Sequence, residues 1–444
     1  MLCPTITATN SQALTTTKTP QTGTRGARMA AMSPDFGEFN LIDPKDYADH
    51  GYPHKIWDWM RAHDPVYWCE NNDASPFWAI TKHADITTIG KLPQKFVNGP
   101  ILVQSHLPLP PGRMDFPPTL IQLDPPKHGV YRRLISKRFT PRALLRFHND
   151  IEEIGKEIVD DLLEGGREGE CDFVEAVSAP LPIAVIAWML GLPKEDWKLL
   201  FDWTNRIIGA QDPSFRVEGK TSDESAQETM LELFSYFSEL AEEKRKNPAD
   251  DLVSLFTQME VDGEPLPHMD IMTWCLIIVV AGNETTRNAT TGGLLAFVEN
   301  QHELRRLQAD PNLLAPAVEE IVRWTAPIIH FARTATEDFE LRDKVIKAGE
   351  TVALFYPSAN RDEEVFEAPN EFRIDRNPNR HLGFGVGEHF CLGAHLARLE
   401  MEVAYKYLLP RIEEVELAGP VDRLHSSLVG GIKHLPIRYK LRDA

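Results

Sequence analysis

The sequence predicts a mainly α-helical protein with a minor β part, and three observations support that fold class. Apolar residues recur at helical spacing in four long segments, at residues 174–190, 229–246, 269–298 and 315–324. Short runs with the composition of strands lie at residues 65–67, 77–80, 328–334, 339–341 and 350–356. Hydrophobic residues make up 42% of the chain and charged residues 25%, which is ordinary for a globular protein with a large buried core.

The remaining elements are expected near the two ends of the chain and in one loop. A short helix is predicted at residues 54–61, a long helix at 392–409, and a loop with a pair of strands at 421–441. Residues 97–123 are rich in proline and glycine and predict a long irregular loop, a kind of segment that is usually functional. Since no repeat or internal linker interrupts the chain, residues 36–444 are predicted to form a single domain.

Residues 1–35 are predicted to be a disordered tail. The first 34 residues are rich in threonine and serine, with three basic side chains and no acidic one. They lack an apolar segment, so they do not form a secretory signal. Two other readings stay open: a faint similarity to a transit peptide, and a true start at Met29 or Met32.

Charge and cysteine content disfavour several classes of function. A formal net charge of −19 argues against nucleic acids and anionic membranes as partners. No apolar run reaches the length of a transmembrane helix, and the best candidate, residues 274–281, is short. The cysteines are widely spaced without a Cys-x-x-Cys pair, which disfavours a disulfide framework or a zinc site and favours a reducing, cytoplasmic setting. They are Cys3, Cys69, Cys171, Cys275 and Cys391.

The strongest functional signal is the ten-residue string that contains Cys391. Three glycines, Gly385, Gly387 and Gly393, bracket this cysteine and permit positive φ angles and close approach to a flat ligand. The cysteine comes just before a predicted helix, whose N-terminal N–H groups stabilise a thiolate. An iron-bound thiolate pushes electron density onto the metal and favours cleavage of an O–O bond. The alternative, a buried structural cysteine in a tight turn, is our interpretation of Cys275.

The same string resembles the haem-binding signature of the cytochrome P-450 family, Phe-x-x-Gly-x-x-x-Cys-x-Gly. Phe384, Gly387, Cys391 and Gly393 match it without a gap, and His389 is the residue typical of soluble bacterial members. The resemblance covers nearly the whole chain after the tail. It implies the family's fold, a triangular helical prism in which haem b lies buried between two long helices, with Cys391 as the iron ligand.

The resemblance also implies a reaction. A member of this family inserts one oxygen atom of dioxygen into an unactivated C–H bond, using two electrons from an iron–sulfur ferredoxin and its ferredoxin reductase. Two alternatives stay open, a peroxide-driven peroxygenase on the same scaffold and a non-enzymatic haem sensor. Neither alternative needs a proton relay.

A proton relay is predicted in the helix at 269–298. Residues 281–286, Ala-Gly-Asn-Glu-Thr-Thr, match the family pattern Ala-Gly-x-Asp/Glu-Thr-Thr. A glycine inside a helix costs roughly 1 kcal/mol relative to alanine, and a buried glutamate costs more unless it is paired. Because dioxygen cleavage needs protons, we predict Glu284 and Thr285 as catalytic residues and expect Gly282 to open a gap in the helix over the haem. Taken alone, the pair could equally be a helix cap or a surface pair.

Haem carries two propionates, and the resemblance supplies cationic partners for them. His128 and Arg132 lie in one string, Arg333 follows Pro327, and His381 precedes the cysteine string. Each of them alone could be an ordinary surface charge. The full set of predicted cofactor-binding residues is His128, Arg132, Arg333, His381, Phe384, Gly385, His389, Cys391 and Gly393, with Cys391 as the metal ligand.

Glu320 and Arg323 are expected on one face of the helix at 315–324, three residues apart. Alone this spacing is a weak signal, because surface ion pairs of this kind are common. The resemblance pairs them with Arg376, and we interpret the three residues as structural.

Residues 127–148 form a local reversal of charge in this acidic chain. The segment contains seven lysine and arginine residues and no acidic residue. We hypothesise that it is the docking surface for an acidic ferredoxin, because charge complementarity raises association rates. A solvated helix face is the alternative.

The resemblance places a substrate pocket on the distal side of the haem, lined mainly by apolar residues. A pocket of that kind binds hydrophobic ligands, although each residue alone could be plain core. Residues 323–327, 356–366 and 379–385 look close to the terpineol-hydroxylating subfamily, which suggests a monocyclic terpenoid, an alkylbenzene or a polycyclic aromatic hydrocarbon as substrate. The principal predicted substrate-binding residues are Ile277, Val280, Ala281, Ile329, Phe331 and Val429. Further candidates are Ile101, Leu102, Val103, Ile207 and Leu428, with Asn283 and His330 as polar contacts.

Overall fold

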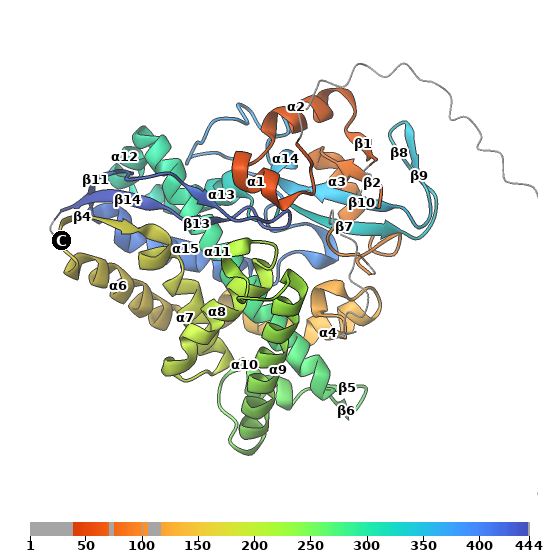
Figure 1. Ribbon diagram of the computed structural model, residues 1–444, viewed down its shortest axis with the longest axis horizontal. Coiled ribbons are helices and arrows are strands. Elements are labelled where there is room, and N and C mark those ends of the chain that lie inside the picture. The colour runs from red at the N-terminus through yellow and green to blue at the C-terminus, as the bar shows by residue number, and fades with distance from the viewer. Residues whose placement is uncertain (1–38, 71–74, 100, 105–116, 443–444) are drawn as a thin grey trace, which may run out of the picture. The chain divides into compact units, whose positions relative to one another are not determined.

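A long helix, α11 (His268–Glu299), crosses the interior of the fold and contacts helices from most of the chain (Figure 1). The computed structural model describes residues 39–70, 75–99, 101–104 and 117–442, so the predicted tail lies outside the described residues. The helices packed on α11 include α7 (Pro180–Leu190), α8 (Trp197–Ile208), α9 (Ser222–Lys246), α13 (Leu314–Thr325) and α15 (Ala394–Leu408).

Shorter or more peripheral helices surround this centre. They are α1 (Pro44–His50), α2 (His54–His63), α3 (His83–Gly90), α4 (Lys127–Ser136), α5 (Pro141–Leu144), α6 (His148–Glu164), α10 (Leu252–Thr257), α12 (Gln301–Ala309) and α14 (Tyr356–Ala359). The contacts group residues 38–444 as one unit, and the predicted domain boundary at residue 36 stays a prediction.

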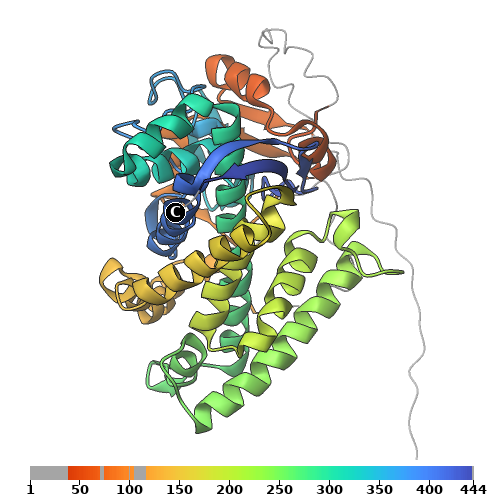
Figure 2. The same ribbon diagram turned by 90° about the vertical axis from the view of Figure 1, so that its left-hand side faces the viewer.

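The β part consists of one larger sheet and several small ones. In the five-stranded sheet the order is β1-β2-β10-β7-β3, and only the β2–β10 pair is parallel among its described strands. Its strands are β1 (Val66–Cys69), β2 (Phe77–Ile80), β3 (Phe96–Val97), β7 (His330–Ala335) and β10 (Thr351–Phe355). This sheet lies at one end of the molecule and helices α8–α10 lie at the other (Figure 1, Figure 2).

A three-stranded sheet and three hairpins complete the β part of the described chain. The three-stranded sheet has the order β11-β14-β4 and joins the C-terminal segment to the chain before α7. Its strands are β4 (Glu168–Asp172), β11 (Ile412–Leu417) and β14 (Pro436–Leu441). The paired strands are β5 (Glu260–Val261) with β6 (Glu264–Pro265), β8 (Phe339–Leu341) with β9 (Lys344–Ile346), and β12 (Asp422–Arg423) with β13 (Ile432–His434).

Most of the predicted elements occur where the periodicity put them, so the fold class is confirmed. The strands at 77–80 and 339–341 are observed with those bounds, and the helices at 269–298 and 315–324 differ by one residue at each end. Helix α9 begins at Ser222 rather than at residue 229, because Thr221 and Glu224 form a capping box there. The predicted loop at 97–123 contains the short turn Leu120–Gln122, and its residues 100 and 105–116 lie outside the described residues.

A buried ion network joins α13 to the chain that follows α14. The Glu320 carboxylate accepts two hydrogen bonds of 2.7 Å from Arg323 and further hydrogen bonds from Arg376. Arg323 also donates to the backbone oxygens of Asn360 and Glu371. All of these charged groups are paired and hydrogen-bonded, which offsets the cost of their burial, and the arrangement agrees with a structural role.

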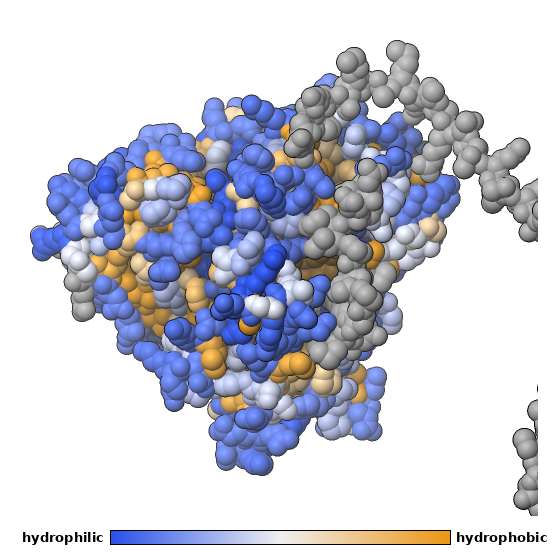
Figure 3. Space-filling view, viewed as in Figure 1, coloured by the Kyte–Doolittle hydropathy of each residue, from blue (hydrophilic) through white to orange (hydrophobic). Residues whose placement is uncertain are grey.

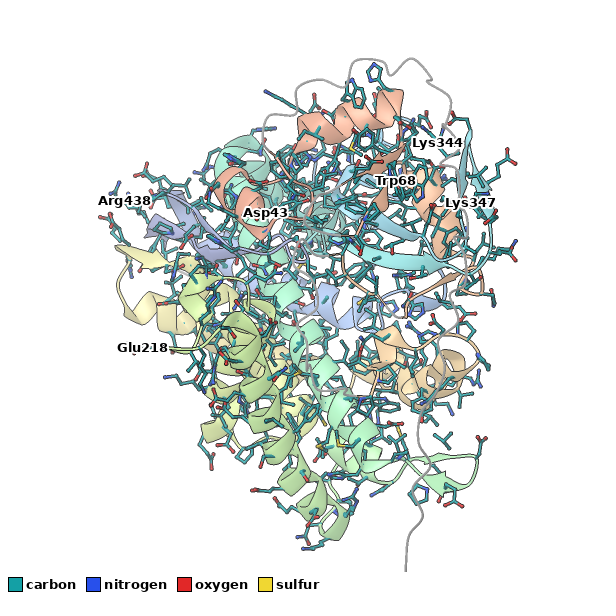
Figure 4. All side chains as sticks on the ribbon, turned by 45° about the vertical axis from the view of Figure 1, so that its right-hand side comes forward. Asp43, Trp68, Glu218, Lys344, Lys347 and Arg438 are labelled. Carbon is teal, nitrogen blue, oxygen red and sulfur yellow. The ribbon has the colours of Figure 1, made fainter. Side chains whose placement is uncertain are left out.

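The visible surface is mostly hydrophilic (Figure 3), as expected from the charge of the chain. Charged side chains such as Glu218, Lys344, Lys347 and Arg438 lie at the periphery, while α11 runs through the interior (Figure 4). Among the described residues, no helix combines the length and the apolar character needed to cross a bilayer.

Candidate active site

A cavity of about 250 Å³ lies between α11 and the segment that leads into α15. One wall is a face of α11, and the opposite wall is the cysteine string with the first turns of α15. From α11 the lining residues are Ile277, Ile278, Ala281, Gly282, Thr285, Thr286 and Ala289. From the opposite wall they are Phe384, Gly385, Val386, His389, Cys391, Leu392, Gly393, Leu396, Ala397, Glu400 and Met401.

Cys391 lines this cavity just before α15. Its backbone N–H donates to the Phe384 oxygen at 2.8 Å, which closes the loop around the sulfur. Burial raises the pKa of the Cys391 thiol, and the backbone N–H of Gly393 and the guanidinium of Arg132 offset part of the increase. The N-terminus of α15 therefore provides part of the expected thiolate stabilisation, and a bound metal cation is the group that would provide the rest.

Two of the three bracketing glycines adopt the left-handed backbone that was predicted. Gly385 has φ +70° and Gly387 has φ +80°. At Gly387 a Cβ would stand 2.0 Å from the Gly90 oxygen, so the loop is pressed against α3. Gly393, at the N-cap of α15, has an ordinary φ of −86°. A Cβ at this position would meet no atom within 4 Å, so the glycine leaves open space at the cavity wall.

Positively charged and imidazole side chains gather at one end of the cavity, as predicted. His128 and Arg132 come from α4, Arg333 from β7, and His389 from the cysteine string, and all four line the cavity. The rings of His128 and His389 stack with their centroids 4.0 Å apart. Burial, followed by the charges of His128 and the two arginines, lowers the pKa of His389 to about 3. The imidazoles thus offer neutral N–H donors and the guanidinium groups supply the positive charge.

His381 does not join this group. Its Nε2 lies 3.0 Å from the Glu319 carboxylate, which also binds Arg398, and the ring is outside the described cavity lining. Glu319 of α13 thus binds the Nε2 atom of the imidazole, and the role of His381 towards a propionate stays a prediction.

On α11 only one member of the predicted acid–alcohol pair faces the cavity. Thr285 lines it and donates its hydroxyl proton to the Ala281 oxygen at 2.9 Å. Glu284 is buried outside the described lining, where Arg287 pairs with it and the Asn288 amide donates to it at 3.0 Å. Neighbouring residues on a helix point about 100° apart, so Glu284 and Thr285 do not share a direction.

Gly282 brings α7 close to α11. A Cβ there would stand 2.5 Å from the Ile186 Cδ1 atom, and both residues line the cavity. Helix α11 runs unbroken from His268 to Glu299, and the role of Gly282 in opening a gap over the haem stays a prediction. The glycine serves close packing between the two helices.

Half of the principal predicted substrate-binding residues line the cavity. Ile277, Ala281 and Phe331 do so. Three others lie outside the described lining, namely Val280, Ile329 and Val429. Ile329 and Val429 are fully buried. Ile101, Leu102, Val103, Ile207, Leu428, Asn283 and His330 are likewise not part of the described lining.

Helix and strand geometry explain these placements, and the roles of the residues in substrate binding stay predictions. Val280 lies on the side of α11 opposite Ile278, since two residues at about 100° each give a rotation of about 200°, slightly more than a half-turn. Strand β7 begins at His330, so the alternation that places Phe331 and Arg333 on the cavity side does not extend back to Ile329. Ile328 lines the cavity in its place.

Further polar residues of the cavity, among them Thr286, Tyr356 and Glu400, were not predicted. Tyr356, at the start of α14, lines the cavity beside Arg333. Glu400 lines it from α15. The position of Glu400 could have been predicted from the sequence. One helical face carries Gly393, Leu396, Ala397 and Glu400, so a single acid lies on an otherwise apolar stripe.

Comparison with known proteins decides the family. The family model described as cytochrome P450, written here P-450, matches residues 112–429. The chain belongs to the cytochrome P-450 family. It is a P-450 monooxygenase, since its curated relatives are named as monooxygenases and hydroxylases.

Two curated relatives cover almost the whole P-450 chain. It is 36% identical to cytochrome P-450-terp from Pseudomonas sp., over 90% of this chain and 96% of the relative. It is 37% identical to a steroid C26-monooxygenase from Mycobacterium tuberculosis, over 90% of this chain and 92% of the relative.

Solved structures confirm the P-450 fold. CYP108D1 from Novosphingobium aromaticivorans aligns with a TM-score of 0.81 at 36% identity, covering 90% of this chain and 97% of that one. CYP268A2 from Mycobacterium marinum, solved in complex with pseudoionone, aligns with a TM-score of 0.84 at 33% identity, covering 90% and 98%.

The P-450 family uses haem b, and the residues of this cavity fit that group. A flat apolar macrocycle needs apolar walls, its iron needs a thiolate, and its two propionates need donors and positive charge. Cys391 would bind the iron. Arg132, Arg333, His128 and His389, which gather at one end of the cavity, would hold the propionates.

Proposed function

We propose that this P-450 hydroxylates a small hydrophobic molecule with dioxygen and two electrons from an iron–sulfur ferredoxin. The substrate classes are monocyclic terpenoids, alkylbenzenes and polycyclic aromatic hydrocarbons. The observation that carries the proposal is the apolar wall of the cavity, to which Ile277, Ile278, Ala281, Ile328 and Phe331 contribute. Such a wall favours ligands through burial of apolar surface rather than through hydrogen bonds.

The residues on α11 manage protons in this proposal. When bound, haem supplies the binding and reductive cleavage of dioxygen. Thr285 orients a water with its hydroxyl, which the Ala281 oxygen holds in place at 2.9 Å. Glu284 exchanges protons with solvent after its pairing with Arg287 opens. An acid and an alcohol acting in series contribute through general acid catalysis.

The basic segment 127–148 is the proposed ferredoxin surface. Exposed Lys127, Arg133, Lys137, Arg142 and Arg146 are the cations of this segment that face solvent. The Arg132 guanidinium donates to the Phe390 oxygen, so α4 lies directly beside the loop of Cys391. A docked acidic protein would then lie near the thiolate side of the haem. The wide spacing of the cysteines suggests a reducing compartment, and we propose the cytoplasm.

Two alternatives make different predictions about turnover. A peroxygenase would sustain comparable turnover with peroxide in place of dioxygen, ferredoxin and reductase. A haem sensor would consume no substrate from a broad panel under any of these conditions. The cavity-facing hydroxyl of Thr285 favours the monooxygenase.

The proposal is tested by titrating the ferric protein with p-cymene, α-terpineol, biphenyl, phenanthrene, a fatty acid and a sterol. A ligand that displaces the iron-bound water moves the Soret band to shorter wavelength. We expect this shift with one of the small hydrocarbons or terpenoids. A shift with the sterol or fatty acid alone would replace our substrate class, and product analysis with ferredoxin and reductase would then identify the oxidised carbon.

A further inference from the structure

The imidazole of His330 lies where three segments of the chain meet beside the cavity wall. His330 is the first residue of β7 and is fully buried, with its ring packed against Phe355 of β10 at a centroid distance of 5.3 Å. Its Nε2 atom accepts a hydrogen bond of 3.1 Å from the backbone N–H of Gln104, and the backbone of Ser427 lies next to the ring. His330 is outside the described cavity lining, so it acts on these segments rather than on a ligand.

Residues 101–104 run along one edge of β7, in the same antiparallel sense as β3. The Ala332 N–H donates to the Leu102 oxygen at 2.7 Å, and two residues further along the Gln104 N–H reaches the His330 ring. In a regular antiparallel ladder a backbone carbonyl would accept that second bond. At the start of β7, the imidazole nitrogen therefore takes the place of a backbone acceptor and holds the end of this segment.

The Gln104 N–H needs a neutral imidazole as its acceptor. Burial lowers the pKa of His330 to about 4, and the nearby backbone of Ser427 and Gln104 offsets part of the decrease. The ring is thus neutral at neutral pH, and its proton is on Nδ1 when Nε2 accepts. The Nδ1 atom makes no well-formed hydrogen bond among the described residues, a cost that a phenylalanine of similar shape would avoid. What histidine offers here, and phenylalanine does not, is the acceptor at Nε2.

The strand that His330 opens is also part of the cavity wall. Phe331, the next residue of β7, lines the cavity, and so does Ile328. Successive side chains of a strand point to opposite faces, so a shift of the backbone at His330 also moves the Phe331 ring. The turn at Leu428 holds the wall from another side, because the Ile329 N–H donates to the Leu428 oxygen at 2.8 Å.

We propose that His330 is a positioning residue that determines which ligand shapes the cavity accepts. By accepting from the Gln104 N–H, its imidazole fixes residues 101–104 along β7 and keeps Phe331 in one position on the apolar wall. The inference rests on the proposed function only in that the cavity binds a hydrophobic substrate. Without the bond, the wall moves and discriminates less between ligands of different shape.

The first test reads the hydrogen bond in the ferric, substrate-free holoenzyme. Hydrogen–deuterium exchange is measured by mass spectrometry with fragmentation that resolves the Gln104 and Ala332 amides. In His330→Phe, which keeps a flat ring without an acceptor, both amides should exchange at least about tenfold faster than in the wild type. In His330→Gln, whose Oε1 atom can accept the same N–H, exchange should return to the wild-type rate. Wild-type exchange in His330→Phe would overturn the proposal, and equal acceleration in both variants would do the same by assigning the effect to lost packing.

The second test reads the discrimination between ligands. The probes are 1-phenylimidazole and 4-phenylimidazole, which bind the haem iron through nitrogen and direct the phenyl ring differently, so the result does not depend on the proposed substrate class. The ratio of their dissociation constants, measured by absorbance titration, should move towards one by at least about threefold in His330→Phe and be restored in His330→Gln. An unchanged ratio in His330→Phe would contradict a role in specificity. If these ratios change as expected while no hydrocarbon or terpenoid shifts the Soret band, the proposed function fails and the role of His330 stands.

A change on the donor side covers the case in which His330→Phe does not fold. Gln104→Pro removes the backbone N–H and leaves the imidazole in place, and it should accelerate exchange at Ala332 and move the ligand ratio in the same direction. The matched control is Gln104→Ala, which keeps the N–H and loses only the side-chain bond to the Ser75 oxygen, and it should change both less. Equal effects of the two substitutions would show that the N–H bond to His330 is not what positions the wall.

Discussion

Thr285 is the side chain of the cavity wall on which the proposed proton transfer depends most directly. Its hydroxyl is the group of α11 that both faces the cavity and is fixed by a hydrogen bond to its own helix. A hydroxyl held this way can order a water without moving, which lowers the cost of organising the site for each turnover.

We predict that Thr285→Ala folds and binds haem normally but releases peroxide in place of product. The variant loses the group that orients the proton donor, so electrons reach oxygen without productive cleavage. The product formed per electron pair should fall about tenfold, measured by comparing reductant consumed with product and peroxide formed. Unchanged coupling would remove Thr285 from the mechanism, and Thr285→Ser serves as the control that keeps the hydroxyl.

A second prediction at this scale concerns the ligand itself. Cys391→His should retain haem, because the walls and the cationic end of the cavity are untouched. It should lose the absorption bands that report a thiolate ligand, measured on the reduced carbon monoxide complex. If those bands persist, another sulfur is the ligand. Cys69→Ser, away from the described cavity lining, is the control.

Among the elements, α11 and α15 both line the cavity; α11 contributes the hydroxyls of Thr285 and Thr286, and α15 contributes the carboxyl group of Glu400. Helix α11 is also tied to α8, since Thr204 accepts from the Asn283 amide and Asn205 accepts from Arg287. The position of α8 is therefore coupled to the ion pair of Glu284. The ion network around Glu320 likewise connects α13 to the segment before the cysteine string.

We predict that Glu320→Gln lowers the free energy of unfolding by about 3–5 kcal/mol, because it leaves Arg323 and Arg376 buried with reduced compensation. Chemical denaturation of the holoenzyme, followed by far-ultraviolet circular dichroism, measures the change. Glu303→Gln is a useful comparison, since its partner Arg306 is half exposed. A loss no larger than that of the comparison variant would show that the network is not a stabilising core.

Helices α4 and α5 carry the prediction about the electron donor. Arg133→Glu combined with Arg142→Glu should slow reduction by the ferredoxin and weaken its dependence on salt, since both cations are exposed. Arg138 is a poorer target because it already pairs with Asp250 at 2.6 Å. Stopped-flow reduction at several ionic strengths measures the effect, and reversal of Lys344 and Lys347, on the β8–β9 hairpin, is the control. An unchanged rate would place the docking surface elsewhere.

At the scale of the whole molecule, acid stability depends on groups that link distant segments. Glu319 of α13 binds His381, in the segment before the cysteine string, and Arg398 of α15. Burial alone would raise the pKa of Glu319, but the hydrogen bonds from His381 and Arg398 lower it to about 2. A carboxyl whose pKa is lower in the folded state stabilises the fold above its unfolded pKa, and this stability is lost as the pH falls.

We therefore predict that the free energy of unfolding of the wild type falls on acidification from about pH 5 towards pH 2 more steeply than that of Glu319→Gln. The difference should approach roughly 2 kcal/mol, reduced for the partial exposure of the side chain. Urea unfolding at a series of pH values measures both curves. Parallel curves would show that Glu319 does not contribute to acid stability.

Features that are local in the chain could be predicted from the sequence alone. The string around Cys391 is continuous, so its glycines, its cysteine and the helix that follows could be interpreted together, and two of the three glycines have the predicted φ. Long helices such as α11 were predictable because a repeat of 3.6 residues is written directly in the apolar residues.

The direction in which a side chain faces, and the distant groups that it contacts, depend instead on the packing of the folded chain. Glu284 and Thr285 are neighbours in the chain, yet only Thr285 lines the cavity. His381 is predicted as a propionate partner, and in the fold its Nε2 atom lies 3.0 Å from the Glu319 carboxylate of α13. Glu400 lines the cavity because α15 packs against α11. Motifs record residue types in order, whereas direction and pairing depend on how helices rotate and pack against one another.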